Sequence, residues 1–269
     1  MVLEGGVSGK LPAIVRQQQR NDLIRHLHTV LKTPSPLGQY QAERARRAVL
    51  GDVVLLEAGT ETARHHHAMV LGPVGWNELV ERAREFYGAP RIDSVELAAE
   101  YAPGLEHALR DRVWKMTEEE PALVLEPAPE TLPPPPSELT IRRVRDDAGL
   151  EDFFSISRTG RRYVPSVEAV RDPNVGVLVG YVDGQAVATA RLSGHGEVAD
   201  IMGIVTRPEH RRRGYATAMT WAAVGAGRGM GCSAFLLTAT EMGYPVYVKM
   251  GFVRVCTMRT YEPPEVPSP

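Results

Sequence analysis

The sequence predicts a mixed α/β protein made of two domains. The chain has 269 residues, of which 43% are hydrophobic, enough for one large core or two modest ones. Short apolar runs typical of strands alternate with segments of helical spacing on both sides of a proline-rich stretch at residues 126–137. Prolines at this density exclude a helix or a central strand and favour an extended linker. We therefore expect an N-terminal domain over 1–126, a linker over 127–138, a second domain over 139–262 and a flexible tail over 263–269.

The N-terminal domain is expected to mix helices and strands. Apolar residues recur at helical spacing in some segments, and short apolar runs separate them. The expected helices cover residues 11–31, 39–50, 76–87 and 105–112, and the expected strands cover 52–57, 68–71, 94–97 and 122–125.

The C-terminal domain is expected to begin with a strand and a helix, followed by three strands in succession. A tight-turn signal, Val182-Asp-Gly-Gln185, separates the first two of these three strands. A helix, a strand, a short helix and a final strand follow. The expected strands cover 139–143, 176–182, 186–193, 197–206, 234–239 and 253–261, and the expected helices cover 147–157, 214–229 and 244–250.

An arginine-rich loop joins the apolar run 201–206 to the helix at 214–229. Its spacing is Arg211-x-x-Gly214-x-Ala216, with small residues where the helix begins. The first N–H groups of a helix lack intrahelical partners, and the helix dipole and nearby arginines favour negative charge there. The loop therefore predicts a diphosphate site. Alternatively, Gly214 only shapes a turn and the arginines only solvate a helix end.

A second motif follows the strand at 234–239. It reads Tyr247-x-x-x-Gly251-Phe252 and combines the end of a short helix with a return to strand. Over roughly residues 139–262 the chain resembles the GNAT superfamily of N-acyltransferases, which use an acyl-CoA. The resemblance implies a GNAT fold, a mixed twisted sheet with helices on both faces, in the C-terminal half. Residues 90–96 and 101–109 resemble a smaller, degenerate GNAT-like α/β domain preceding it, with an unrelated α/β domain as the alternative.

The resemblance implies acetyl-CoA as co-substrate and no metal. The strands at 197–206 and 234–239 are expected to splay apart, so that backbone groups of the first bind the pantetheine arm as an added strand would. The implied cofactor-binding residues are Ile204, Val205 and Thr206 on the strand, and Arg211, Arg212, Arg213, Gly214, Tyr215, Ala216 and Thr217 in the loop and helix start. Many relatives carry an asparagine after the second strand, where this chain has Thr240 and Glu241.

Transfer to an amine requires a base for the amine, a donor for the carbonyl oxygen and a proton for the departing thiolate. The resemblance assigns Tyr247 as the acid, and the N–H of Ile204 as the oxyanion donor. Asp200 is the preferred base. Glu197, Glu241 and His195 remain alternatives, each also readable as an ordinary solvated residue, and His195 lies in a Ser-Gly-His-Gly stretch that favours exposure.

The expected reaction is direct transfer of an acetyl group to a primary amine in a ternary complex. No cysteine lies in the motif region, which argues against an acyl-enzyme. The acceptor is a small-molecule or peptide amine, and the protein is expected to be a monomer or homodimer. A non-catalytic acyl-CoA-binding regulatory module is the alternative function.

Composition excludes other classes. A net charge of -2 and a pI near 6.5 argue against nucleic-acid binding. No apolar run is long enough to span a bilayer, and no signal peptide is apparent, so a cytoplasmic protein is expected. Cys232 and Cys256 have no metal or disulfide spacing and are expected to be buried thiols. Three adjacent histidines at 65–67 alternate in direction on a strand and make a poor metal chelate.

Overall fold

The computed structural model describes residues 25–27, 29–30, 46–59, 64–157 and 166–264. Residues 25–27 and 29–30 are helical. The elements of the N-terminal half are β1 (Arg46–Leu50), β2 (Val53–Gly59), β3 (Arg64–Val70), α2 (Trp76–Tyr87), β4 (Ser94–Ala98), α3 (Pro103–Asp111) and β5 (Lys115–Leu125).

The C-terminal half contains the remaining elements. They are β6 (Thr140–Arg143), α4 (Asp147–Phe154), α5 (Val167–Arg171), β7 (Val175–Val182), β8 (Gln185–His195), β9 (Val198–Thr206), the 3-10 helix η3 (Pro208–His210), α6 (Tyr215–Gly229), β10 (Ala234–Thr238), α7 (Tyr244–Lys249) and β11 (Val253–Glu262). None of the described helices is long and apolar enough to cross a membrane.

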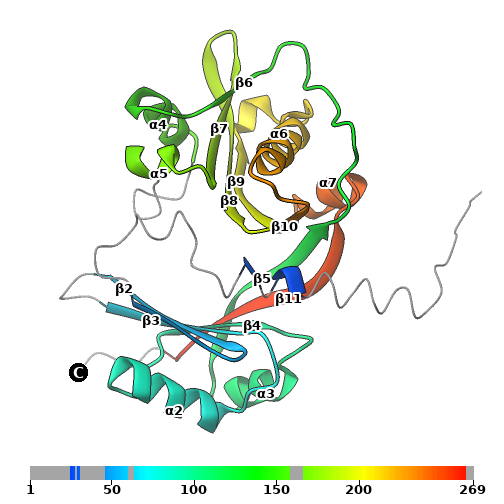
Figure 1. The fold of residues 1–269 in the computed structure, drawn as a ribbon. Helices are drawn as coiled ribbons and strands as arrows, with labels where there is room; N and C mark the ends of the chain where they lie inside the picture. Colours follow the sequence, from blue (N-terminus) through cyan, green and yellow to red (C-terminus); the bar gives the residue numbers. More distant parts are fainter. Residues whose placement is uncertain (1–24, 28, 31–45, 60–63, 158–165, 265–269) are drawn as a thin grey trace, which may run out of the picture.

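All the described strands belong to one sheet, and the two halves exchange strands within it. The order is β1-β2-β3-β4-β11-β5-β10-β9-β8-β7-β6. Strand β5 of the N-terminal half lies between β10 and β11 and is antiparallel to both, and β11 also pairs with β4. Figure 1 shows β5 and β11 as the two long strands that run from one half into the other. Each half therefore completes the sheet of its neighbour.

Helices cover different faces of the sheet in the two halves. In the N-terminal half, α2 and α3 pack on the face of β2, β3 and β4 that is turned away from the C-terminal half (Figure 1). In the C-terminal half, α6 covers one face of β8, β9 and β10, while α4 and α5 cover the opposite face of β7. A further apolar cluster joins the halves, with Leu27 and Val30 packed beside Ala98, Val198 and Leu236.

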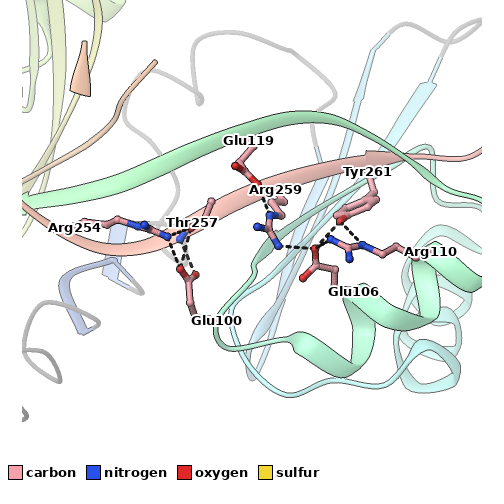
Figure 2. Close-up of polar contacts among 8 residues, drawn as sticks. All are labelled: Glu100, Glu106, Arg110, Glu119, Arg254, Thr257, Arg259 and Tyr261. Atoms are coloured by element: carbon pink, nitrogen blue, oxygen red, sulfur yellow. Dashed lines mark hydrogen bonds and ion pairs between the residues drawn. The ribbon is translucent and has the colours of Figure 1, made fainter. Parts of the chain in front are cut away.

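Polar contacts attach β11 to the N-terminal half, as Figure 2 shows. Glu106 of α3 accepts hydrogen bonds from the Tyr261 hydroxyl at 2.6 Å and from Arg259 Nη1 at 2.7 Å. It also accepts one from Arg110 Nη2 at 2.7 Å. Burial alone would raise the pKa of Glu106, but the hydrogen bonds from Tyr261 and Arg259 bring it below the ordinary value. These donors therefore compensate the cost of burying the carboxylate.

A second carboxylate, that of Glu100, binds β11 at a position closer to the start of the strand. Glu100 accepts from the backbone N–H of Thr257 at 2.7 Å, from its hydroxyl at 2.9 Å and from Arg254 Nη2 at 2.8 Å. Arg259 also donates to Glu119 at 2.6 Å. We call this set the β11 anchor; its members are Glu100, Glu106, Arg110, Glu119, Arg254, Thr257, Arg259 and Tyr261 (Figure 2).

The proline-rich segment lies along α6. Arg228, near the end of the helix, donates to the carbonyl oxygens of Ala128 at 3.0 Å and Glu130 at 3.1 Å. Farther along, a Cβ built on Gly225 would lie 3.2 Å from Leu132, so the missing side chain allows the linker to approach the helix. An extended chain advances ~3.1 Å per residue and a helix ~1.5 Å, so a few linker residues span much of α6.

Most predicted elements are present, with some differences. Strand β3, predicted at 68–71, begins at Arg64, and the 3-10 helix η3 was not predicted. Residues 46–50 of the predicted helix at 39–50 form β1, whose partner in the sheet is β2. The strand predicted at 122–125 begins at Lys115, and α5 was not predicted. Most of the predicted helix at 11–31 lies outside the described residues. Both cysteines are buried as predicted, and the turn between β7 and β8 has Asp183 and Gly184 at positive φ.

Candidate active site

Strands β9 and β10 separate partway along their length. They pair in parallel through Ala234↔Val198, Phe235↔Ala199 and Leu236↔Asp200 only. Beyond that point β9 remains paired with β8, and β10 with β5. The predicted splay is present, and on the β10 side no described strand pairs with the edge of β9 after Asp200.

Backbone groups of two predicted residues face this opening. The N–H of Arg207 donates to Val187 of β8 at 2.9 Å, which directs residue 207 toward β8. Because alternate residues of a strand direct their backbone groups to opposite edges, Ile204 and Thr206 face the other way, toward the opening. Gly203, at φ 62, lies in a register shift between β8 and β9 beside Ile204. The edge is thus suited to main-chain hydrogen bonds with an extended ligand.

The arginine-rich loop enters α6 through two residues with left-handed backbone. Arg212 has φ 61 and Gly214 has φ 80, and no side chain caps the helix start. The first intrahelical bond is donated by Ala218 to Gly214 at 3.0 Å. The N–H groups of Tyr215, Ala216 and Thr217 therefore precede the helical ladder, as expected for the first turn of a helix.

Side chains around the loop divide into two groups. Arg211, Arg212 and Arg213 are exposed, and Arg211 Nε donates to the Thr206 carbonyl at 3.3 Å. Tyr215 points inward, with 1% of its surface exposed and its hydroxyl 3.1 Å from Glu138 Oε1. Its side chain is part of the core, so only its backbone is available to an anion.

A cleft of about 260 Å³ connects the strand edge to this loop. It is lined by Ser155, Ile156, Ser157, Val205, Thr206, Arg207, Pro208 and Arg211. Arg207 spans it, with Nη2 donating to Ser155 Oγ at 3.0 Å. Residues at the end of α4 therefore line the same cleft as Val205, Thr206 and Arg211, three of the predicted cofactor-binding residues.

Tyr247 lies on α7, the helix that follows β10. It is 7% exposed, and its ring meets Phe252 edge-on with 5.9 Å between ring centroids. A Cβ on Gly243 would come within 3.0 Å of the Tyr247 ring, so the glycine makes room for it. Burial raises the pKa of Tyr247 to about 12, with a smaller contribution from the charge of Glu120. The phenol is therefore a proton donor at neutral pH.

Asp200 stands at the last paired position before the strands separate. It is half-buried on the face of β9 opposite α6, because its neighbours Ala199 and Ile201 pack beneath α6. Burial raises the pKa of Asp200 to about 7; the Arg191 guanidinium opposes this rise, and the charge of Glu96 adds to it. A carboxyl group with this pKa accepts a proton readily near neutral pH.

The other base candidates are placed differently. Glu197 and Glu241 are exposed, which fits the reading of ordinary solvated residues. The expectation that His195 is exposed was wrong, because the residue lies inside β8 and is 4% exposed. Burial lowers the pKa of His195 to about 4, with a further contribution from the charge of Arg47. Neither ring nitrogen has a hydrogen-bond partner among the described residues.

Three residues near the site were missed by the sequence reading. Glu96 and Glu120 come from the N-terminal half and act electrostatically on Asp200 and Tyr247, and Arg191 comes from β8. The alternation of residues along β8 could have predicted the position of Arg191, because it places Arg191 on the same face as Ser193 and His195. The two glutamates depend on the packing of one half against the other.

The three adjacent histidines at 65–67 point alternately to the two faces of β3, as residues of a strand do. His65 and His67 share a face and both contact Ser94 Oγ, at 2.9 and 2.8 Å. His66 lies on the opposite face, with its ring centroid 4.4 Å from that of Tyr87. Within the described part of the chain, no three His, Cys, Asp or Glu side chains are grouped as metal ligands.

Comparisons with known proteins agree with this architecture. Residues 141–252 match the model of the Acetyltransferase (GNAT) family. A GCN5-related N-acetyltransferase from Kribbella flavida matches with a TM-score of 0.69 and 22% identity, over 90% of this chain and 96% of that chain. A tandem GNAT protein from the clavulanic acid biosynthesis pathway matches with a TM-score of 0.58 and 12% identity, over 94% of this chain and 97% of that chain.

A third structure, a GCN5-related N-acetyltransferase from Sphaerobacter thermophilus, has a TM-score of 0.57 and 14% identity, over 80% of this chain and 78% of that chain. At these identities the likeness shows the fold. It confirms the predicted GNAT fold of the C-terminal half, preceded by a smaller GNAT-like α/β domain. Among curated proteins, none matches this sequence.

Proposed function

We propose that the GNAT acetyltransferase domain formed by residues 141–252 is an N-acetyltransferase that transfers an acetyl group from acetyl-CoA to a primary amine. One observation carries this proposal: β9 separates from β10 beside a helix start whose first N–H groups precede the helical ladder. The two features offer a strand edge to an extended arm and an anion site to its diphosphate.

The residues fit the co-substrate in three places. The backbone of Tyr215, Ala216 and Thr217, with the exposed Arg211 to Arg213, suits the diphosphate. The edge of β9 at Ile204 and Thr206 suits the pantetheine amides, and Val205 lines the adjoining cleft. Acetyl-CoA supplies a thioester, whose carbonyl carbon is the site of attack.

The protein's part in the reaction is to move protons and stabilise charge. Asp200 accepts the proton that the amine loses as its nitrogen forms the new N–C bond. The N–H of Ile204 stabilises the negative charge on the carbonyl oxygen. As the C–S bond breaks, Tyr247 donates a proton to the sulfur, and its pKa of about 12 keeps that proton available at neutral pH.

The transfer is direct. Cys232 and Cys256 are both buried, and neither lines the cleft beside β9. Attack by the amine on a bound thioester therefore needs no acyl-enzyme. The mechanism requires a ternary complex, which predicts intersecting rather than parallel double-reciprocal plots.

The experiment is incubation with acetyl-CoA and a panel of primary amines, following release of free thiol. We expect release with at least one acceptor, and Tyr247→Phe to lower turnover by about tenfold to a thousandfold while acetyl-CoA affinity stays nearly unchanged. Tyr244→Phe, on the same helix, is the matched control and should retain turnover. Acetyl-CoA binding without thiol release on every acceptor would instead indicate a non-catalytic binding module, and unchanged turnover in Tyr247→Phe with several amines would remove its acid role.

A further inference from the structure

Polar side chains line one face of β8 and β9 near the point where β9 and β10 separate. Arg191, Ser193 and His195 are alternate residues of β8, so they share a face. Asp200 of β9 is the cross-strand partner of Ser193 and lies on the same face. The intervening residues pack beneath α6 on the other side of the sheet; they are Leu192, Ala199 and Ile201.

Apolar clusters flank this polar row on both sides. Met202 and Val205 continue β9 into the cluster beneath α4 and α5, and Val198 begins β9 in the cluster that contains Leu27. Burying a polar group without a hydrogen bond costs free energy. Only 4% of the surface of His195 is exposed, and neither of its ring nitrogens is hydrogen-bonded to any described residue. An unpartnered buried imidazole in this row indicates a ligand site.

The N-terminal half contributes charged residues to the same place. Arg47 of β1 is close enough to His195 to lower its pKa, and Glu96 of β4 is close enough to Asp200 to raise its pKa. In Figure 1, α2 and α3 lie on the far side of β2 to β4, so the opposite face of this half is turned toward β8 and β9. Arg47 and Arg191 are both half-buried. Charges of both signs, those of Arg47, Arg191 and Glu96, therefore act on His195 and Asp200.

We propose that this face, made of Arg47, Glu96, Arg191, His195 and Asp200, binds the acceptor and selects an amine that carries a carboxylate only a few bonds away. The proposal rests on the function proposed above. Asp200 and Glu96 attract the amino group, and Arg191 presents the planar pair of donors that a carboxylate fits. Neutral His195 has one donor and one acceptor nitrogen for the rest of the ligand.

Strand geometry limits the length of the acceptor. Asp200 is opposite Ser193, and Arg191 and His195 each lie two residues from Ser193 along β8. Two residues of a strand span ~6.6 Å, so an anion site on either side is a short distance from the base. An α- or β-amino acid fits this spacing, whereas the C-terminal carboxylate of a long peptide does not. Asp200, the last residue before the opening, puts the amino group at the thioester end of the site.

Matched acceptors test the carboxylate directly. Thiol release from acetyl-CoA is measured with glycine, β-alanine and other amino acids, each against its own carboxamide, with rates referred to the free-base amine. We expect kcat/KM to be about tenfold or more higher for the carboxylate, the value of a charge-assisted hydrogen bond. Equal values for both members of each pair would overturn the proposal while leaving the acetyltransferase function standing.

Variants locate the selectivity on this face. Arg191→Gln is expected to abolish the preference, mainly through a higher KM for the carboxylate member. Because Arg191 also opposes the pKa rise of Asp200, the rates for both members of a pair should fall, and the readout is the ratio of their kcat/KM values. Arg142→Gln, an exposed arginine on β6, is the matched control and should keep the preference. If Arg191→Gln does not fold, Arg47→Gln on the edge strand carries the same test. Retention of the full preference in both variants would contradict the assignment.

A binding measurement distinguishes a wrong acceptor site from a wrong proposed reaction. If no acceptor releases thiol, the CoA-bound protein is titrated with the same pairs and its Tm is followed. Stabilisation by the amino acids but not by their carboxamides, lost in Arg191→Gln, would support the site even though the proposed reaction had failed. No shift with any amino acid would overturn the site.

Discussion

Two polar clusters of this molecule, the β11 anchor and the face between the halves, both contain carboxyl groups beside arginines. They shift the pKa values of these carboxyl groups in opposite directions. In the β11 anchor, Glu106 receives three donors, and its pKa lies below the ordinary value despite burial. In the face between the halves, the pKa of Asp200 rises to about 7 and that of His195 falls to about 4. The anchor favours the charged form of its acid, and the face between the halves disfavours the charged forms of Asp200 and His195.

The difference separates structural charge from functional charge. Donors supplied by the fold compensate Glu106, so that carboxylate stabilises strand β11. Arg191 compensates Asp200 only in part, and neither ring nitrogen of His195 has a hydrogen-bond partner among the described residues. Groups with pKa values shifted toward neutrality or held neutral by burial are typical of sites that exchange protons or bind ligands. The comparison predicts that substitutions in the anchor change stability and those in the face change activity.

The largest expected effect is on turnover. Asp200→Asn removes the proposed base and is expected to lower kcat/KM by about 10²- to 10³-fold, measured with acetyl-CoA and the best acceptor of the panel. Its Tm at pH 8 should be equal to or above that of the parent, because the ionised carboxylate is disfavoured in the fold. Glu197→Gln, an exposed carboxylate just before β9, is the control and should retain activity. An active Asp200→Asn variant would assign the base elsewhere.

The pH profile checks the same residue without a substitution. In the proposed mechanism the ionised form of Asp200 is the base, so kcat/KM referred to the free-base amine should rise with pH up to about 7 and then level off. Its raised pKa makes the opposite contribution to folding: this part of the stability is complete below the unfolded-state pKa and is lost as pH rises through about 7. Arg191 and Glu96 act on the charge of Asp200, and Arg47 acts on His195, which lies on the same face of β8 and β9. A profile in Asp200→Asn with the same limb would exclude Asp200 as its origin.

The second effect is on stability. Glu106→Gln leaves the buried Tyr261 and the half-buried Arg259 without their shared carboxylate. We expect it to lower the free energy of unfolding by about 2–4 kcal/mol, measured in denaturant. The lowered pKa of Glu106 gives this contribution above its unfolded-state pKa and removes it as pH falls. Glu119→Gln removes the exposed partner of Arg259 and should cost below about 1 kcal/mol. Equal losses in the two variants would contradict the distinction between buried and exposed partners.

Local signals explain why the fold of the C-terminal half could be predicted. The helix start at Gly214 and the turn at Gly184 both need backbone conformations that glycine adopts readily, and both are visible in a short window of sequence. The strand that ends at Thr206 and the helix that carries Tyr247 follow in chain order. Asp200 was chosen as the base candidate because it lies on the strand that leads into the loop, and it occupies the last paired position before the strands separate. Its role as the base stays a prediction.

Long-range pairing explains what was missed. Residues 46–50 read as helix, yet they form β1 because they pair with β2 from Arg46↔Glu57 to Leu50↔Val53. The full length of β5 was not apparent because its first residues, Lys115 to Glu120, are polar except for Met116 and are held by β11 and not by a local pattern. His195 was expected to be exposed because a Ser-Gly-His-Gly stretch looks like a turn, whereas the cover over it comes from elsewhere in the chain.

The smallest expected effect separates the diphosphate loop from ordinary turn geometry. Gly214 and Gly184 have nearly the same backbone, with φ 80 and φ 78, and an added Cβ meets only Pro136 at 3.9 Å in the first case and nothing within 4 Å in the second. Alanine at either position is therefore strained only by its backbone and should cost about 1 kcal/mol, or ~2–4 °C in Tm.

Only one of these two glycines adjoins the proposed anion site. Gly214→Ala displaces the N–H groups at the start of α6 and is expected to weaken acetyl-CoA binding by a few-fold, measured by calorimetry, whereas Gly184→Ala leaves the affinity unchanged. Because the two variants lose similar stability, a change confined to Gly214→Ala cannot come from general destabilisation. Unchanged affinity in both would remove the diphosphate from this loop, and an equal loss in both would show that the affinity follows overall stability.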